Sequence, residues 1–472
     1  MTMDQMQTPL YDALQQMAER DPMSFHVPGH KNGNIFPGRG RVFFDAVLPL
    51  DMTELTGLDD LHAPKDVIGH AQKLAAAFFG ADETFFLVGG STAGNLAMIM
   101  AVCQPGDTII VQRNSHKSII NGLELSGARP VFAAPEWDEA KDRYTAPSIH
   151  TIQQALRQHP DAKAIALTYP DYFGGTFELK EMIDLAHAYH IPVLVDEAHG
   201  VHFSLGRAFP ASALDLGADG VVQSAHKMAP ALTMGSYLHI RSQRLATNRI
   251  SHYLQMLQSS SPSYPIMATL DLARFYLASL TNRDVTTITD SAAQMKAILE
   301  DSWAWSILES DDPLKITIQT KAGITGNVLA RALEQEAIYP ELSNHNHVLM
   351  VHGLTPFTGM VHLKNAITRI GTQLKFTENN AIINMDDLFS EKLTELHLDY
   401  QEMHERCSRP ISFQQSAGYT AAEPVIPYPP GIPLILKGER IRDRHLQLVE
   451  QLRRQGVSFQ HRDVAGTINV FQ

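Results

Sequence analysis

The feature that most constrains the fold is a repeated alternation of short, nearly all-apolar segments with helical segments between about residues 65 and 240. Such apolar segments are typical of strands that are covered on both faces. The helical segments between them are the crossovers that parallel strands require. The sequence therefore predicts an α/β domain with a mostly parallel sheet. The expected strands are residues 84–88, 107–112, 129–133, 162–168, 192–196, 220–223 and 235–240, and the expected helices include residues 67–79, 93–102, 179–189 and 266–279.

A second, smaller α/β module is expected after about residue 280, where strand-like residues 314–319 and 348–351 surround a helical pattern. Polar residues 377–384 are interpreted as a linker. The proline-rich segment Tyr428 to Pro433 is interpreted as a loop before a final helix at about residues 440–455. We expect four parts: an N-terminal segment at residues 1–64, a large domain at 65–280, a small module at 281–385 and a C-terminal domain at 386–472.

Polar residues stand where the expected strands end, which is where ligands of parallel sheets bind. One of these places is a glycine turn followed by Ser91-Thr92-Ala93 at the start of a helix. Backbone N–H groups and two hydroxyls meet there, which favours an anion site. An ordinary helix N-cap produces the same pattern. The turn has neither the lysine of a P-loop nor the GxGxxG spacing of a dinucleotide site.

Asp196 and Lys227 each follow an apolar strand. A carboxylate at the end of a buried strand is costly unless a cation pairs with it, although a core salt bridge or a helix cap would also explain it. Lys227 ends the sequence Ser224-Ala225-His226-Lys227, where an ordinary surface lysine is the alternative. An amine, a carboxylate and a phosphate cup are the parts that a pyridoxal 5'-phosphate (PLP) enzyme needs.

Several histidines are weaker candidates. His116 opens a helix after a strand, where it can stack on a planar ring or remain an exposed helix-end residue. His199 follows Asp196 closely and can orient it or line a ring pocket. His26 and His30 are separated by Pro28-Gly29, which forbids the helix of an HExxH zinc site, so we expect no metal.

Composition restricts the class of protein. The chain of 472 residues has a formal net charge of −13, which argues against nucleic acid and anionic membranes as partners and weakly favours a cationic substrate. Its two cysteines, Cys103 and Cys407, have no metal or redox spacing, and a reducing cytoplasm is the natural interpretation. We expect no signal peptide and no membrane-spanning helix.

Taken together, these motifs resemble the Orn/Lys/Arg decarboxylase family of fold-type-I PLP enzymes, in the compact form that lacks the N-terminal wing domain. The resemblance covers nearly the whole chain and is specific as a set. The matching segments are Phe25 to Lys31 (the family's F-H-x-P-G-H-K), Glu54, Leu58 to Leu61, Gly90 to Asn95, Arg113 to Ser118, Asp196 to His199, Ser224 to Lys227, Ser261 to Tyr264 and Tyr428 to Pro433.

The resemblance implies an aminotransferase-like large domain, smaller α/β C-terminal domains, and decarboxylation of arginine, lysine or ornithine in a homodimer or higher homo-oligomer. Its implied cofactor-binding residues follow from the matching motifs. They are Lys227 as the Schiff-base lysine, Asp196 on the pyridine nitrogen, His116 over the ring, Ala198 beneath it, Ser91, Thr92, Ser224 and His226 around the phosphate, and Ser260 or Ser261 toward the neighbouring subunit's phosphate. We also count Ala93 of the glycine turn and His199 among the cofactor-binding candidates. His226 or Lys227 would return the proton.

Substrate recognition is less constrained. A basic amino acid needs an acidic group far from its reacting carbon, and Glu423 is one candidate, with Asp171 and Glu341 as weaker ones. The chain departs from the family at Pro170-Asp171-Tyr172 and at Lys437-Gly438-Glu439, and either departure can alter substrate choice.

Two alternatives remain. An aminotransferase would use the same lysine and aspartate with a late arginine, for which Arg369 and Arg406 are available. A PLP-fold regulator that has lost catalysis is disfavoured because Lys227 and Asp196 are both retained.

Overall fold

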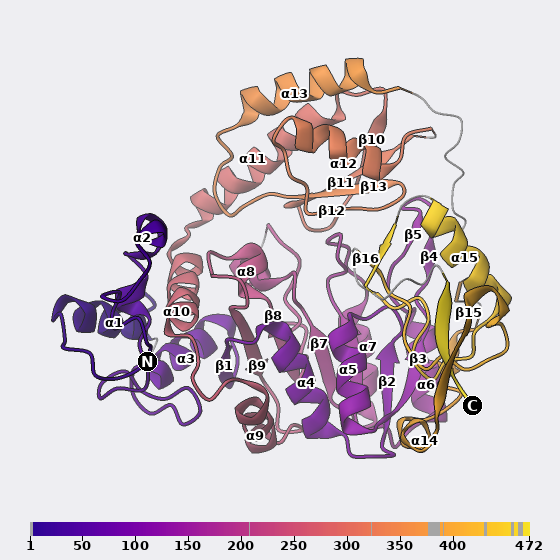
Figure 1. Cartoon of the computed structure of the whole chain (residues 1–472), viewed down its shortest axis with the longest axis horizontal. Helices are drawn as coiled ribbons and strands as arrows, with labels where there is room; N and C mark the ends of the chain where they lie inside the picture. The colour runs from indigo at the N-terminus through magenta and orange to yellow at the C-terminus, as the bar shows by residue number, and fades with distance from the viewer. Residues whose placement is uncertain are drawn as a thin grey trace. The chain divides into compact units, whose positions relative to one another are not determined.

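The computed structural model describes residues 3–206, 208–321, 323–375, 388–389, 391–428, 432–454, 457–460 and 466–472 (Figure 1). The chain divides into two compact units. Unit 1 comprises Met1–Val102, Pro192–Arg207 and Ala211–Thr281, and unit 2 comprises Cys103–Ile191, Ala208–Pro210 and Asn282–Gln472. The predicted linker at residues 377–384 and the centre of the predicted proline-rich loop, residues 429–431, lie outside the described residues.

The strands among the described residues of unit 1 lie in the order β1, β9, β8, β7. β7 and β8 are parallel, whereas β9 is antiparallel to both β8 and β1. The sequence predicted these strands but not the reversed direction, because a strand buried on both faces has the same composition in either direction. The strands are β1 (Glu83–Leu87), β7 (Val193–Asp196), β8 (Gly220–Gln223) and β9 (Ser236–Ile240).

The helices of unit 1 include the predicted crossovers. α4 packs closely on the strands, because a Cβ at Gly94 would come within 2.8 Å of the side chains of Leu87 and Val222. The helices are α1 (Pro9–Glu19), α2 (Gly38–Phe44), η1 (Leu48–Leu50), α3 (Val67–Phe79), α4 (Gly90–Val102), η2 (Val201–Leu205), α8 (Ala225–Met228), α9 (Thr247–Leu257) and α10 (Tyr264–Ser279).

Unit 2 begins with strands in the order β6, β2, β3, β14. β2 is parallel to β3 and β6, and β14 adds an antiparallel edge to β3. Parallel pairing in both units agrees with the predicted α/β class. The elements are β2 (Thr108–Gln112), α5 (Lys117–Ser126), β3 (Arg129–Ala133), β4 (Trp137–Asp138), β5 (Arg143–Tyr144), α6 (Ile149–Gln158), β6 (Ile165–Thr168), α7 (Leu179–Ala188) and β14 (Leu393–Glu395).

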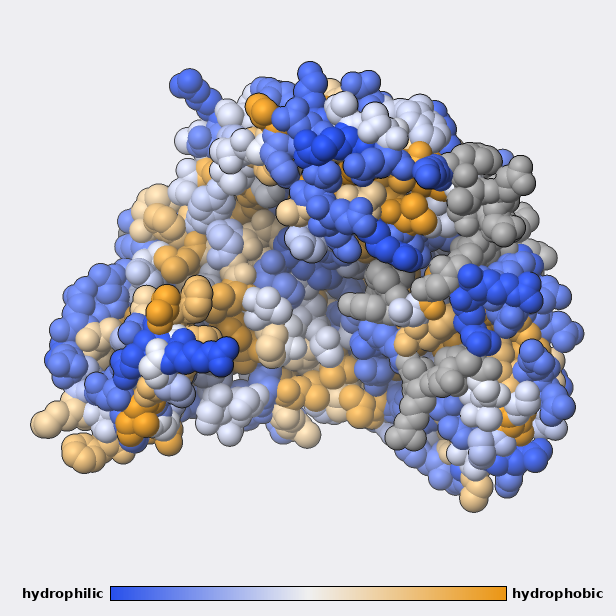
Figure 2. Space-filling model, turned by 45° about the horizontal axis from the view of Figure 1, so that its top comes forward, coloured by the Kyte–Doolittle hydropathy of each residue, from blue (hydrophilic) through white to orange (hydrophobic). Residues whose placement is uncertain are grey.

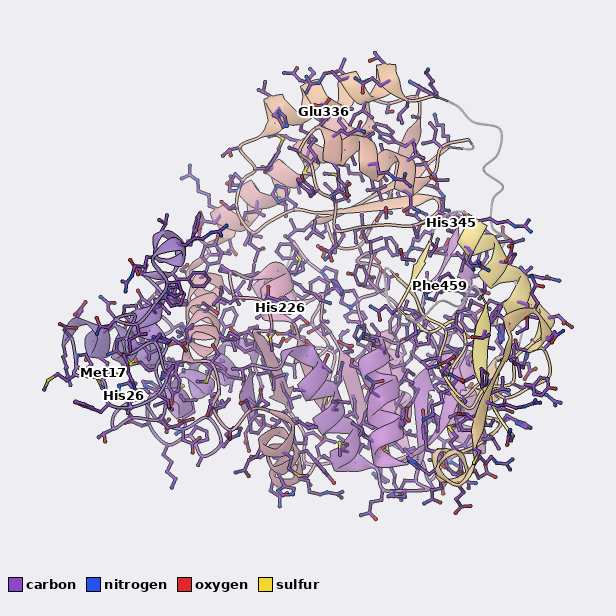
Figure 3. All side chains as sticks on the ribbon, viewed as in Figure 1. Met17, His26, His226, Glu336, His345 and Phe459 are labelled. Carbon is purple, nitrogen blue, oxygen red and sulfur yellow. The ribbon has the colours of Figure 1, made fainter. Side chains whose placement is uncertain are left out.

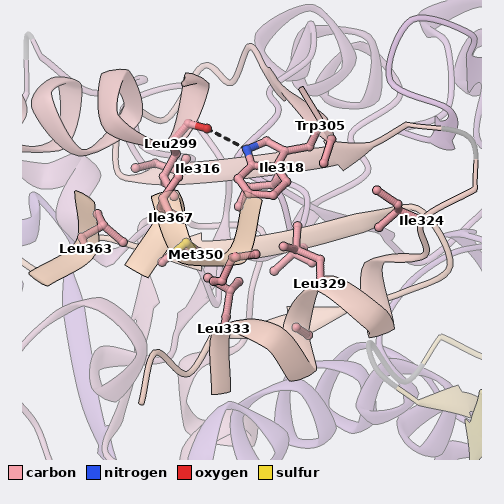
Figure 4. Close-up of a cluster of buried hydrophobic side chains, with 14 of the residues drawn as sticks. Leu299, Trp305, Ile316, Ile318, Ile324, Leu329, Leu333, Met350, Leu363 and Ile367 are labelled. Carbon is pink, nitrogen blue, oxygen red and sulfur yellow. Dashed lines mark hydrogen bonds between the residues drawn. The ribbon is translucent and has the colours of Figure 1, made fainter. Parts of the chain in front are cut away.

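The predicted small module is an antiparallel sheet in the order β10, β11, β13, β12 with three helices. Its core gathers aliphatic side chains around Trp305, whose indole Nε1 donates to the Leu299 carbonyl at 2.6 Å (Figure 4). The elements are α11 (Asn282–Glu300), β10 (Trp305–Leu308), β11 (Lys315–Thr320), α12 (Gly326–Gln335), β12 (Leu342–Ser343), β13 (His347–Val351) and α13 (Met360–Gln373).

The C-terminal region has its own apolar core, to which Val449 and Val470 belong. Two antiparallel pairs, β15 with β18 and β16 with β17, accompany the last helix. None of the described helices is both long and apolar enough to cross a membrane. The elements are α14 (Tyr400–Glu405), β15 (Ser408–Ser412), η3 (Phe413–Gln415), β16 (Pro427–Tyr428), α15 (Asp443–Arg454), β17 (Ser458–Phe459) and β18 (Thr467–Phe471).

A fully buried ion pair on α10 holds the N-terminal helix α1. Arg274 Nη2 lies 2.6 Å from Asp271 Oδ1, and the guanidinium also donates to the carbonyls of Gln5 and Gln7. The other carboxylate oxygen of Asp271 accepts from the backbone N–H of Leu10 at 3.0 Å, in the first turn of α1. The start of the chain is therefore fixed by charged groups that have no contact with water.

We expect Arg274→Met to lower the free energy of unfolding by about 3–5 kcal/mol, because the Asp271 charge would stay buried without its partner. Urea unfolding measures this loss. Arg283→Met, at an exposed arginine of α11, is the control and should change stability by less than about 0.5 kcal/mol. Equal losses in the two variants would contradict the role of the buried pair.

Candidate active site

Asp196 ends β7 and is 4% exposed. Its Oδ2 accepts from the Asn95 side-chain amide at 2.9 Å, and its Oδ1 accepts from the Ala198 backbone N–H at 3.2 Å. Both donors are neutral, so they orient the carboxyl group without balancing its charge. Sequence reasoning missed the role of Asn95, although an amide one turn after Ser91 on an otherwise apolar helix is a polar group that needs a buried partner.

Lys227 lies on α8, the short helix that follows β8. Its Nζ is 2.9 Å from Nε2 of His199, which is buried in the segment after β7. Neighbouring parallel strands thus bring the lysine and the histidine together at their carboxyl ends. His199, which the sequence suggested could orient Asp196 or line a ring pocket, therefore contacts Lys227 in the structure.

Hydroxyl groups gather at the N-terminus of α4. The Ser91 and Ser224 hydroxyl oxygens lie 2.5 Å apart, and Ser236 Oγ is 3.4 Å from Ser91 Oγ. Thr92 is exposed in the same first turn, and Ala93 is buried behind it. His226, labelled on α8 in Figure 3, places its Nδ1 3.0 Å from the Gly235 carbonyl oxygen. A helix N-terminus with converging hydroxyls is suited to a phosphate.

Unit 1 therefore holds an amine, a buried carboxyl group with neutral donors and a cluster of hydroxyls on adjacent segments. These residues fit PLP, whose ring nitrogen can carry the positive charge that Asp196 receives from neither of its two donors. Ser260 and Ser261 are exposed in the turn before α10. Their predicted contact with a neighbouring subunit's phosphate stays a prediction.

In unit 2, His116 is the N-cap of α5, and its Nδ1 accepts from the Ser118 backbone N–H at 3.2 Å. The stacking role predicted for its ring stays a prediction. Arg113, just after β2, is buried and donates to the carbonyls of Pro433 and Leu434 at 2.8 and 3.2 Å. It also pairs with Glu439 at 2.8 Å. Arg113 thereby anchors the C-terminal region to the strand end that precedes His116.

The candidate substrate carboxylates all have protein partners. The Asp171 Oδ2 pairs with Arg143 at 2.5 Å, and its Oδ1 accepts backbone N–H groups in its own turn. Glu423 accepts from the backbone and the side chain of Asn469 at 2.8 and 3.0 Å. Glu341 accepts from the Tyr172 hydroxyl at 2.9 Å. Their roles toward a substrate stay predictions.

The other unusual residues have structural partners too. Lys437 pairs with Glu124 of α5 at 2.5 Å, so this departure from the family pattern adds an ion pair at the surface of the unit. Arg369 pairs with Glu336, which Figure 3 labels, through two hydrogen bonds, and Arg406 donates to the Gln472 carbonyl. The two arginines considered for an aminotransferase are thus engaged elsewhere in unit 2.

Comparison with known proteins extends this result. Family models described as the major and C-terminal domains of Orn/Lys/Arg decarboxylase match residues 8–311 and 384–461. The chain is 46% identical to the uncharacterized protein YaaO of Bacillus subtilis, over 95% of this chain and 94% of that one. It is 36% identical to the arginine decarboxylase of the same organism, with the same coverage. The crystal structure of the lysine decarboxylase LdcF of Francisella novicida superposes with a TM-score of 0.84 at 19% identity, over 99% of this chain and 81% of LdcF, which confirms the predicted fold class.

We expect Arg113→Met to lower the free energy of unfolding by about 3 kcal/mol, because two carbonyls and Glu439 lose their shared donor. Arg129→Met is the matched control, since Arg129 forms an exposed ion pair with Asp399 at 3.4 Å. The control should cost less than about 1 kcal/mol. A loss in Arg113→Met no larger than that of the control would show that the anchor contributes little to stability.

Proposed function

Because this chain belongs to the Orn/Lys/Arg decarboxylase family, we propose that it decarboxylates a basic amino acid with PLP as cofactor. The observation that carries the proposal is the grouping in unit 1 of Lys227, the buried Asp196 and the hydroxyls of Ser91 and Ser224. When bound, PLP supplies an electron sink for the pair of electrons that the departing carboxylate leaves behind.

The chain's own residues divide the remaining work. Asn95 and the Ala198 N–H orient Asp196, which would hold a proton on the ring nitrogen by its negative charge. Ser91, Ser224 and the first turn of α4 would bind the phosphate. Lys227 would hold the cofactor, and its Nζ, once the substrate amine has taken its place, would be able to return a proton to the reacting carbon, with His199 Nε2 at 2.9 Å from Nζ to exchange that proton.

Arginine is the first substrate to test. The B. subtilis relative that matches 95% of this chain at 36% identity is named arginine decarboxylase. The net charge of −13 favours attraction of a cationic amino acid. Glu423, which accepts from the backbone and the side chain of Asn469, remains the first candidate carboxylate for its distal cation.

The protein should release the amine from at least one of arginine, lysine and ornithine, identified by mass spectrometry. Lys227→Ala should lower this rate at least a thousandfold, about 4 kcal/mol. After borohydride treatment, the added mass should lie on the peptide that contains Lys227. Lys163→Ala, at an exposed lysine, is the control and should keep the wild-type rate. Amine formation by Lys227→Ala at the wild-type rate would remove this lysine from the proposal.

We also propose a homodimer in which the N-terminal segment contacts a second copy. Large apolar side chains in that segment are exposed, among them Met23 (88%), Phe25 (92%) and Phe43 (83%). Figure 2 shows orange, hydrophobic surface on the visible face of the molecule. Water-exposed apolar groups that cluster in one segment are typical of protein–protein interfaces. Ser260 and Ser261 would then reach the partner's phosphate.

Light scattering should therefore find a dimer at micromolar concentration. Phe25→Asp and Phe43→Asp should each weaken it about tenfold or more, because each places a charge in an apolar contact. Val361→Asp is the matched control, at a residue of α13 that is 77% exposed. An active monomer, or equal weakening by the control, would contradict the proposed interface.

A further inference from the structure

A network of hydrogen-bonded, buried polar side chains links β1, β9 and β8 of unit 1 to the end of β7. The Gln223 side-chain amide nitrogen donates to Glu197 Oε2 at 2.6 Å, and its Oε1 lies 3.0 Å from His239 Nε2. His239 Nδ1 lies 2.8 Å from the Thr84 hydroxyl. The Ala213 backbone N–H donates to the other Glu197 oxygen at 2.7 Å. Glu197, Gln223 and His239 have no exposed surface.

This network lies next to residues of the candidate active site. Glu197 follows Asp196 directly at the end of β7, and Gln223 precedes Ser224 at the end of β8. His239 is the register partner of Thr84 across β9 and β1. Gly200 leaves the space that Glu197 occupies, because a Cβ there would lie 2.7 Å from the Glu197 Cγ. The network thus connects the ends of β7 and β8, which Asp196, Ser224 and Lys227 end or follow.

Two arrangements of hydrogen atoms satisfy every side-chain contact in this network. With Glu197 ionised, the Gln223 amide donates to it, His239 Nε2–H donates to Gln223, and Thr84 donates to His239. With Glu197 protonated, its O–H donates to the Gln223 oxygen, the turned amide donates to His239 Nε2, and His239 Nδ1–H donates to Thr84. Carbonyl and amino ends of an amide are interchangeable in such networks. The neutral state of Glu197 therefore leaves no buried group unpaired.

Burial favours the neutral state. It raises the pKa of Glu197 to about 8, and the charge of Asp215 adds to the effect, while the bonds from Gln223 and Ala213 oppose it. Burial also lowers the pKa of His239 to about 3, so no positive charge arises at the other end. Other ionisable groups on the neighbouring segments include Asp196, His199 and His202 beside Glu197 in the sequence, Asp219 just before β8, and Lys227 on α8.

We propose that Glu197 is a positioning residue that remains neutral in the working protein and, through Gln223, fixes the end of β7 against the end of β8. This role rests on the proposed function only in that the fixed strand ends carry Asp196 and Lys227. A second negative charge beside Asp196 is thereby avoided at neutral pH. Ionisation of Glu197 at alkaline pH would change how these two strand ends are held, and we therefore expect it to weaken cofactor binding.

Protein stability tests the protonation of Glu197 directly. Between its ordinary value of 4.5 and about 8, the folded chain keeps a proton that the unfolded chain releases, so rising pH favours unfolding. The wild-type unfolding constant, divided by that of Glu197→Gln, should rise up to about tenfold per pH unit and level off above about pH 8. Glu181→Gln, at an exposed residue of α7, is the control and should keep the wild-type dependence. A ratio that does not change with pH overturns the proposal.

Cofactor affinity supplies the second measurement, by titration of the full-length protein with PLP. At pH 6.5, Glu197→Gln and wild type should bind PLP within about twofold of each other. At pH 9, wild type should bind about tenfold more weakly than Glu197→Gln, because only about a tenth of its molecules retain the proton. A purely structural role predicts an affinity ratio that is the same at both pH values, and that result would refute the proposal.

A second variant keeps the proposal testable if Glu197→Gln does not fold. Gln223→Met removes a hydrogen bond from both forms of Glu197, but the bond to the carboxylate is the stronger one, so the pKa of Glu197 and the pH above which stability stops falling should both move upward. An unchanged value overturns the proposal. None of these stability measurements depends on amine formation, so an inactive wild-type protein would contradict the proposed function while leaving the role of Glu197 standing.

Discussion

The candidate site depends on how a carboxyl group is accommodated at the buried end of a strand. Placing Asp196 there is costly unless its surroundings compensate, and the two donors that reach it, Asn95 and the Ala198 N–H, are neutral. We propose that the missing positive charge comes with the cofactor. The protein would then favour the protonated ring because that state balances Asp196. Lys227, His199 and the hydroxyls near α4 are arranged around this one electrostatic requirement.

The sequence predicted much of this arrangement because the information is local. Asp196 and Lys227 stand directly after apolar strands, and parallel strands bring such positions to the same edge. The contacts that depend on strand direction and register could not be predicted. Thr84 meets His239 only because β1 and β9 are antiparallel, and strands covered on both faces do not reveal their direction. The partner of Asn95 could not be predicted either, because it depends on how α4 packs on the strands.

The long-range contacts of unit 2 could not be predicted from the sequence either. Arg113 lay in a recognised motif, yet its partners follow more than three hundred residues later, near Pro433. No periodicity connects such distant segments. Asp171 and Glu423 were singled out as acidic residues in informative segments, but their partners, Arg143 and Asn469, depend on how turns and edges fold. An argument from sequence can identify a candidate carboxylate, but it cannot say whether another residue of the protein already forms an ion pair or hydrogen bond with it.

The buried pair on α10 has a consequence for synthesis of the chain. The backbone groups at residues 5–11 are made about 260 residues before their partners Asp271 and Arg274. At about 5–20 residues per second, the N-terminal helix waits roughly 13–50 seconds before it can dock. During that interval its apolar side, which includes Leu10 and Leu14, has no α10 to cover it. Helix α1 is therefore a segment whose apolar side stays partly uncovered while the following residues are made.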